Sequence, residues 1–181
     1  GRGCLAQLKD EIGTLGCKKA LVVSDKFLTE NGVVEKVTKV LDQVGIEHTL
    51  YNDVKQNPSV ANVEGGLEVL KKENCDFIVS IGGGSPQDCG KAISVLATNG
   101  GKITDYEGVN KSQKKCLPIV AIATTAGTSA EVTINYVITD EETHIKMIMV
   151  DRNTLASITV NDPELMLSKP AGLTAATGMD A

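Results

Sequence analysis

The feature that most constrains the fold is an apolar run that ends in three glycines. Residues 77–81 have the composition of a buried strand, Gly82, Gly83 and Gly84 follow directly, and residues 85–99 have a helical pattern. Glycines let the backbone turn sharply and let an anion approach the N–H groups closely. The N-terminus of the following helix offers unpaired N–H groups to a phosphate. The pattern predicts a nucleotide site but is not GxGxxG, and a tight turn that binds nothing is the alternative.

The start of that helix carries residues suited to a cap. Ser85 is predicted as the N-cap, Pro86 as the first helical residue, and Asp88 as the partner of Ser85 in a capping box.

Short β-branched runs alternate with helical patterns along the first two thirds of the chain. Alternation at this pitch is typical of an α/β protein, a Rossmann-like parallel sheet with helices on both faces. Three later apolar runs lack long helices between them and predict a small antiparallel extension, and the pattern becomes helical again from Pro163. The expected strands are 20–25, 48–54, 77–81, 117–123, 132–140, 146–151 and 157–160, and the expected helices are 32–44, 60–73 and 85–99.

Polar residues follow several predicted strands, at the sheet edge where α/β proteins bind ligands. Asp25 ends the first strong strand, where its carboxylate would accept hydrogen bonds from ribose hydroxyls and repel a 2′-phosphate; alternatively it caps the next turn. Asn57 follows the second strand and fits a turn equally well. Thr124, Thr125 and Thr128 follow residues 119–123 in a loop that would lie beside the glycines. Together the two loops could hold one ligand.

Lys146 lies within the otherwise apolar run 145–150. It either faces solvent or points into a cleft, where it would contact a cofactor ribose.

Composition excludes several functions. The formal net charge is -5, aromatic residues make up 3% and tryptophan is absent, which argues against nucleic acid or an anionic membrane as partner. No apolar stretch is long enough to cross a bilayer, and no basic-apolar leader opens the chain. The five cysteines form no CxxC pair and are expected to be free, buried thiols in a cytoplasmic protein. The two histidines, His48 and His144, form no catalytic or metal-binding pattern.

Four segments in order resemble the iron-activated (group III) alcohol dehydrogenases: residues 82–88, 124–128, 131–133 and 173–181. Residues 130–140 are most similar to members that act on lactaldehyde and 1,2-propanediol, although Ala130 stands where the more general motif, as in the 1,3-propanediol and butanol dehydrogenases, has serine. Relatives that use zinc, such as glycerol dehydrogenase and dehydroquinate synthase, are an alternative. A non-catalytic nucleotide-binding module is another.

The resemblance implies an NAD-binding domain over residues 1–162 and the start of a helical metal-binding domain over 163–181. It implies Asp180 as a ligand of Fe²⁺, or of Zn²⁺, with the remaining ligands and all catalytic side chains beyond Ala181, so that residues 1–181 alone would be inactive. Asp25 favours NAD over NADP. The expected cofactor contacts are Asp25, Asn57, Gly82, Gly83, Gly84, Ser85, Asp88, Thr124, Thr125, Thr128, Asn135 and Lys146.

The same resemblance implies hydride transfer between nicotinamide and a small alcohol or aldehyde, in an enzyme that forms a homodimer. Lactaldehyde and 1,2-propanediol are the favoured substrates.

Overall fold

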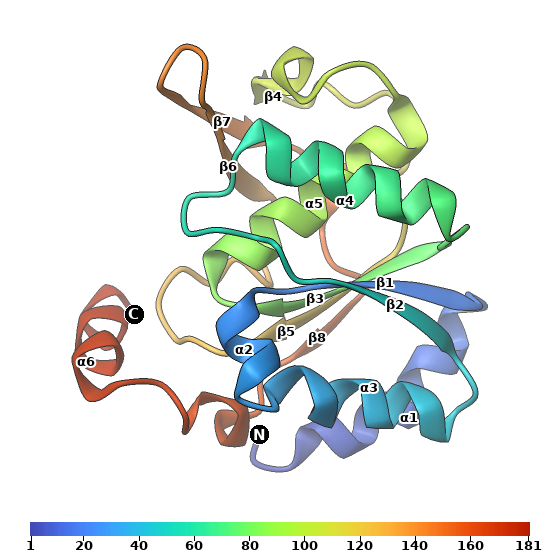
Figure 1. Ribbon diagram of the computed structural model, residues 1–181, viewed down its shortest axis with the longest axis vertical. Coiled ribbons are helices and arrows are strands. Elements are labelled where there is room, and N and C mark those ends of the chain that lie inside the picture. The colour runs from blue at the N-terminus through green and yellow to red at the C-terminus, as the bar shows by residue number, and fades with distance from the viewer.

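The computed structural model describes residues 1–181. A five-stranded sheet lies in the middle of the molecule (Figure 1). Every neighbouring pair of strands is parallel, as predicted. Because the order steps outward from β1 in one direction and from β3 in the other, the topological switch point lies between these two strands. The strand order is β2 (Glu47–Tyr51), β1 (Lys19–Val23), β3 (Phe77–Gly82), β5 (Ile119–Ala123) and β8 (Ile158–Val160).

Helices cover both faces of this sheet (Figure 1). On one face, α4 (Val60–Lys72) and α5 (Gly84–Asn99) pack in one apolar cluster with alternate residues of the strands. On the other face, α1 (Leu8–Ile12) and α3 (Val33–Gln43) pack with the remaining strand residues in a second cluster. Both faces of β3 and β5 are therefore buried, which explains their continuous apolar sequences.

A second, smaller sheet packs against α5. Its strands β6 (Asn135–Asp140) and β7 (Ile145–Val150) form the predicted antiparallel hairpin, and β4 (Gly108–Val109) pairs parallel with β7. The assignment of residues 157–160 to this extension was wrong. β8 has only three residues and pairs with β5 in the main sheet, where Ser157 N–H donates to the carbonyl of Ile119 at 2.8 Å.

Several short helical elements were not predicted, because they contain too few residues to show a helical pattern of apolar side chains. Helix α2 (Lys26–Glu30) follows β1 directly. Single 3₁₀ turns cover Cys4–Gln7, Gly13–Leu15, Ile103–Tyr106 and Arg152–Thr154.

The last segment divides into a 3₁₀ turn, η5 (Pro163–Met166), and helix α6 (Ala171–Asp180), rather than one continuous helix. No residue of α6 is buried, and the helix lies outside the layers of the main sheet (Figure 1). None of the helices is both long and apolar enough to span a bilayer. All five cysteines are free thiols, as predicted, but only Cys75, Cys89 and Cys116 are buried; Cys4 and Cys17 lie in the N-terminal segment and are partly exposed.

Candidate nucleotide-binding site

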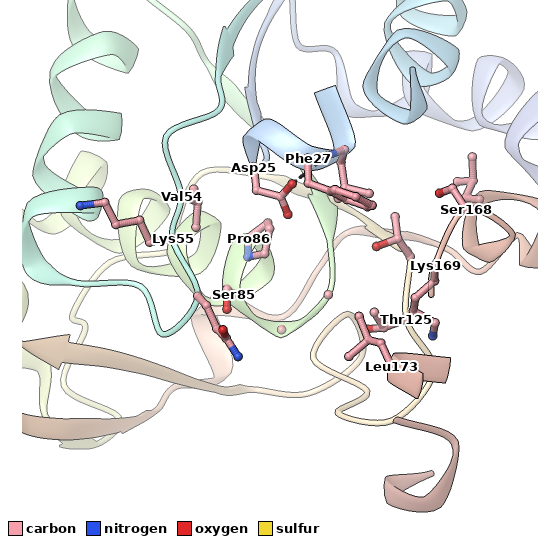
Figure 2. A pocket seen from close by; sticks show the side chains of 16 residues that line it. Asp25, Phe27, Val54, Lys55, Ser85, Pro86, Thr125, Ser168, Lys169 and Leu173 are labelled. Atoms are coloured by element: carbon pink, nitrogen blue, oxygen red, sulfur yellow. Dashed lines mark hydrogen bonds between the residues drawn. The ribbon is translucent and has the colours of Figure 1, made fainter. Parts of the chain in front are cut away.

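A cavity of about 440 Å³ opens at the carboxyl ends of the strands, beside the switch point between β1 and β3 (Figure 2). Helix α2, the loop after β2, the start of α5 and the η5–α6 segment all contribute to its wall. Of the predicted cofactor residues, those that line the cavity are Asp25, Gly83, Gly84, Ser85, Thr124 and Thr125.

The glycine turn is sterically required. A Cβ on Gly82 would lie 2.5 Å from Cγ of Pro86, and Gly82 has a φ of 154°. Helix α5 begins at Gly84 with Gly83 as its N-cap, so the prediction of Ser85 as N-cap was wrong. No side chain caps this helix, and the N–H groups of its first turn therefore have no side-chain acceptor. An anion in the cavity could accept from them.

The loop after β5 contacts the glycine turn, as predicted for two neighbouring strand ends. The N–H of Thr124 donates to the carbonyl of Gly82 at 3.0 Å. A Cβ on Gly83 would lie 2.9 Å from Oγ1 of Thr125, so glycine is needed for this close approach. Thr128 lies next to Gly84, with its Cγ2 3.5 Å from the position of a Cβ there. The two loops form one continuous wall.

Asp25 caps the following helix, which is one of the two roles considered from the sequence, and it also lines the cavity. It is the N-cap of α2, where its Oδ1 accepts a hydrogen bond from the N–H of Leu28 at 2.8 Å. Its side chain also lies at the cavity, near Phe27 (Figure 2). The carboxylate therefore presents negative charge to the cavity while one of its oxygens holds the helix start.

Two further predicted residues contact each other away from the cavity wall. Nζ of Lys146 donates to Oδ1 of Asn57 at 2.9 Å. Asn57 has a φ of 55°, and the carbonyl of Pro58 beside it accepts from the N–H of Thr139 at 2.8 Å. The hairpin of the small sheet is thus attached to the loop that follows β2.

Asp88 lies elsewhere than predicted. Because the helix begins at Gly84, the Asp88 side chain faces β6, where it accepts a hydrogen bond from the N–H of Val137 at 3.1 Å. The capping box with Ser85 does not form, and Asp88 does not line the cavity. Burial raises the pKa of Asp88 to about 6, whereas the Val137 N–H and the charge of Lys91 lower it. Gly82, Thr128 and Asn135 are likewise absent from the cavity wall.

Part of the cavity wall consists of residues that were not predicted to bind a ligand. Phe27 lies two residues after Asp25 and is 50% exposed; an aromatic residue so close to a predicted ligand position could have been noticed. Leu28 lies in the short helix α2, Pro86 in the first turn of α5 and Leu173 at the start of α6, and none of them was predicted to contact a ligand. The remaining wall residues come from irregular loops or short turns that carry no motif. They are Val54, Lys55, Gln56, Leu165, Ser168 and Lys169.

Asp180 is exposed on α6 and has no companion metal ligands. No group of three or more His, Cys, Asp or Glu side chains could hold a metal ion. The residues of this chain therefore do not by themselves fit the iron or zinc that the sequence resemblance implies, and no chemical step through a metal follows from them.

The fold and the cavity together define the class of protein: a Rossmann-like α/β domain with a ligand cavity at its topological switch point. The chain belongs to the iron-containing alcohol dehydrogenase family, whose profile matches residues 1–163.

Relatives of known sequence and structure agree with this assignment. The chain is 53% identical over its whole length to alcohol dehydrogenase 4 of Schizosaccharomyces pombe and 46% identical to an NAD-dependent methanol dehydrogenase of Bacillus methanolicus, and it covers 43% and 48% of them. The structure matches 99% of its length to a 1,3-propanediol oxidoreductase (TM-score 0.96, 46% identity, 47% of that chain). It matches a sulfoacetaldehyde reductase from Bifidobacterium kashiwanohense in complex with NAD⁺ equally fully (TM-score 0.90, 35% identity, 48% of that chain). The chain thus spans about half the length of these relatives.

Proposed function

We propose that this chain is the NAD-binding part of an alcohol dehydrogenase that transfers hydride between nicotinamide and a small alcohol or aldehyde. The observation that carries the proposal is the N-terminus of α5, which follows Gly82 and Gly83, has no side-chain cap and lies at a cavity beside the switch point. Helix starts of this kind bind phosphate groups. A related structure whose fold matches at 35% identity is an NAD⁺ complex.

The polar groups around the cavity suit a dinucleotide. The first-turn N–H groups of Gly84 and Ser85 would donate to the pyrophosphate, and Gly83 lets the loop of Thr125 pack closely against that turn. The carboxylate of Asp25 would accept from the ribose hydroxyls and repel a 2′-phosphate, which selects NAD over NADP. Lys146 and Asn57, joined by their hydrogen bond, would border the cofactor on the side of the small sheet.

Bound NAD would supply hydride transfer at its nicotinamide ring. The residues of this chain would hold and orient the cofactor in that step. We assign residues 1–162 to the cofactor domain and 163–181 to the beginning of a second, helical domain. Asp180 would serve as one ligand of Fe²⁺ or Zn²⁺ only where that second domain supplies the others.

The substrate class is supported by the relatives. One is described as an NAD-dependent methanol dehydrogenase, others as a 1,3-propanediol dehydrogenase of Citrobacter freundii and a lactaldehyde reductase of Escherichia coli. All of these substrates are small alcohols or aldehydes. We propose lactaldehyde and 1,2-propanediol as the first pair to test, in a cytoplasmic homodimer.

Calorimetric titration with NADH and with NADPH tests the cofactor assignment. We expect saturable binding of NADH and much weaker binding of NADPH. Asp25→Asn is the matched variant, because asparagine keeps the N-cap acceptor of α2 but removes the charge. In that variant the preference for NADH should shrink. Failure of the protein to bind either nucleotide would contradict the proposal.

A further inference from the structure

Lys169 lies between η5 and α6, and its side chain lines the cavity on the same side as Thr125 and Leu173 (Figure 2). Asp25 and Lys55 are the other charged residues of the wall. No carboxylate lies within ion-pair distance of the Lys169 ammonium. Lys55 has no ion-pair partner either, but its side chain extends away from Ser85, whereas that of Lys169 lies beside Thr125 (Figure 2).

The single hydrogen bond of the Lys169 ammonium leaves most of its donor capacity free. Its Nζ donates to Oγ1 of Thr177 at 3.1 Å, and that hydroxyl lies 2.9 Å from the carbonyl of Leu173, within α6. An ammonium group has three N–H donors on a flexible stem, so two donors remain for a ligand.

The part of the cavity wall at the start of α5 has no positively charged side chain to balance the charge of a pyrophosphate. The glycines, Ser85, Thr124 and Thr125 offer only uncharged donors and a helix dipole. Lysine commonly complements such backbone donors as a point charge on phosphate. We propose that Lys169 supplies the cationic contact to the pyrophosphate of the dinucleotide bound at the N-terminus of α5.

This inference rests on the proposed function and adds a residue that no motif in the chain indicates. It also gives the η5–α6 segment a role in binding, because the contact would tie that segment to the glycine turn across the cavity. The alternative is that Lys169 only attaches its own segment to Thr177.

The test compares the purified protein with Lys169→Met, Lys169→Arg and Thr177→Val, by titration with NADH, ADP and adenosine. Lys169→Met should weaken the binding of NADH and of ADP by about tenfold at low salt. This loss of affinity should become smaller at higher salt, which screens the contact between the ammonium and the phosphates. Adenosine, which has no phosphate, should be unaffected. Lys169→Arg should restore most of the affinity, and Thr177→Val should bind like the unaltered protein.

Lys36→Met is the charge-matched control, because Lys36 is exposed on α3 and does not line the cavity. Melting temperatures identify any variant that is merely unstable. Unchanged ADP affinity in Lys169→Met would overturn the inference and leave the proposed function intact. An equal loss of ADP affinity in Lys36→Met would also overturn it, because the effect would then come from net charge. An equal loss in Thr177→Val would overturn it as well, because the effect would then come from the attachment of Lys169 to α6. No NADH binding by the unaltered protein would overturn both.

Discussion

The carboxylate of Asp88 accepts a hydrogen bond from the backbone N–H of Val137 at 3.1 Å, which joins α5 to the first strand of the hairpin. One turn further along the helix, Nζ of Lys91 donates to the carbonyls of Thr133 at 2.7 Å and Asn135 at 2.8 Å. Both side chains reach the same strand from the same helix. This polar pair therefore holds the small sheet against α5.

Asp88→Asn is expected to flatten the pH dependence of the unfolding free energy between about pH 4 and 7. Burial raises the pKa of Asp88 to about 6 in the folded protein. The ionised carboxylate therefore disfavours folding above that pH, and this cost disappears as the pH falls toward the unfolded pKa. Linkage sets the effect at no more than about 3 kcal/mol. Urea unfolding of both proteins at about pH 4.5 and about pH 7 measures it, and parallel pH dependence would contradict the assignment.

Lys91→Met should lower the unfolding free energy by roughly 3–5 kcal/mol, the usual cost of removing one partner from a buried charged network. The side chain is 2% exposed, and the variant leaves two carbonyls without their donor. Burial lowers the pKa of Lys91 to about 8, with Asp88 and Glu131 opposing, so the group is still charged at neutral pH. Lys146→Met, which removes an exposed lysine with one hydrogen bond, is the control and should cost less than about 1 kcal/mol. Similar losses of unfolding free energy in Lys91→Met and Lys146→Met would contradict the proposed stabilising role of Lys91.

The strands at the centre of the main sheet could be predicted from the sequence because each is a continuous apolar run of strand length. Residues 77–82 and 119–123 are buried throughout, and only a sheet covered on both faces accommodates such runs. The glycine turn was predictable for a related reason, since few structures other than a tight strand-to-helix turn require glycines at that place.

The remaining features depend on tertiary contacts. β8 is too short for its partner to be read from its residues, and Asp88 changed role because the helix begins two residues earlier than its capping residues indicated. Phe27 and Lys169 join the cavity wall from segments far apart in the chain, without motif or period. Only packing of the η5–α6 segment beside the sheet brings them to one cavity.

Tyr136→Phe should leave the unfolding free energy unchanged or raise it by up to about 1 kcal/mol. The Tyr136 side chain is buried, and its hydroxyl has no hydrogen-bond partner. Its matched control is Tyr106→Phe, because the hydroxyl of Tyr106 donates to the carbonyl of Gly100 at 2.8 Å and its loss should cost about 1 kcal/mol. Urea denaturation separates the two, and an equal loss of stability in both would mean that Tyr136 has a partner in solution.

Asp162→Asn should cost about 1–3 kcal/mol at neutral pH. The buried carboxylate of Asp162 accepts from the N–H groups of Gly3 at 3.0 Å, Leu5 at 3.1 Å and Glu164 at 3.1 Å, and an amide nitrogen in place of one oxygen could not accept.

Burial opposes the ionised form of Asp162, but the three N–H donors outweigh it and lower the pKa. A carboxyl with a lowered pKa stabilises the fold above its unfolded pKa, and this contribution is lost as the pH falls through the folded pKa. The difference in unfolding free energy between the unaltered protein and Asp162→Asn should therefore become smaller at acidic pH. Amide exchange at Leu5 is the local readout, and unchanged protection there would contradict the contact.

Gly83→Val should weaken NADH binding by at least about tenfold while the protein stays folded. A Cβ on Gly83 would already lie 2.9 Å from Oγ1 of Thr125, so the methyl groups of valine must occupy space beside the first turn of α5. Cys116→Ala is the control: the thiol is buried in the core and does not line the cavity, so this variant should lose some stability but keep its NADH affinity. Calorimetry measures binding and thermal melting measures folding. If both variants lost affinity in proportion to their melting temperatures, the effect of Gly83 would be one of stability, and the glycine turn would not be the phosphate site.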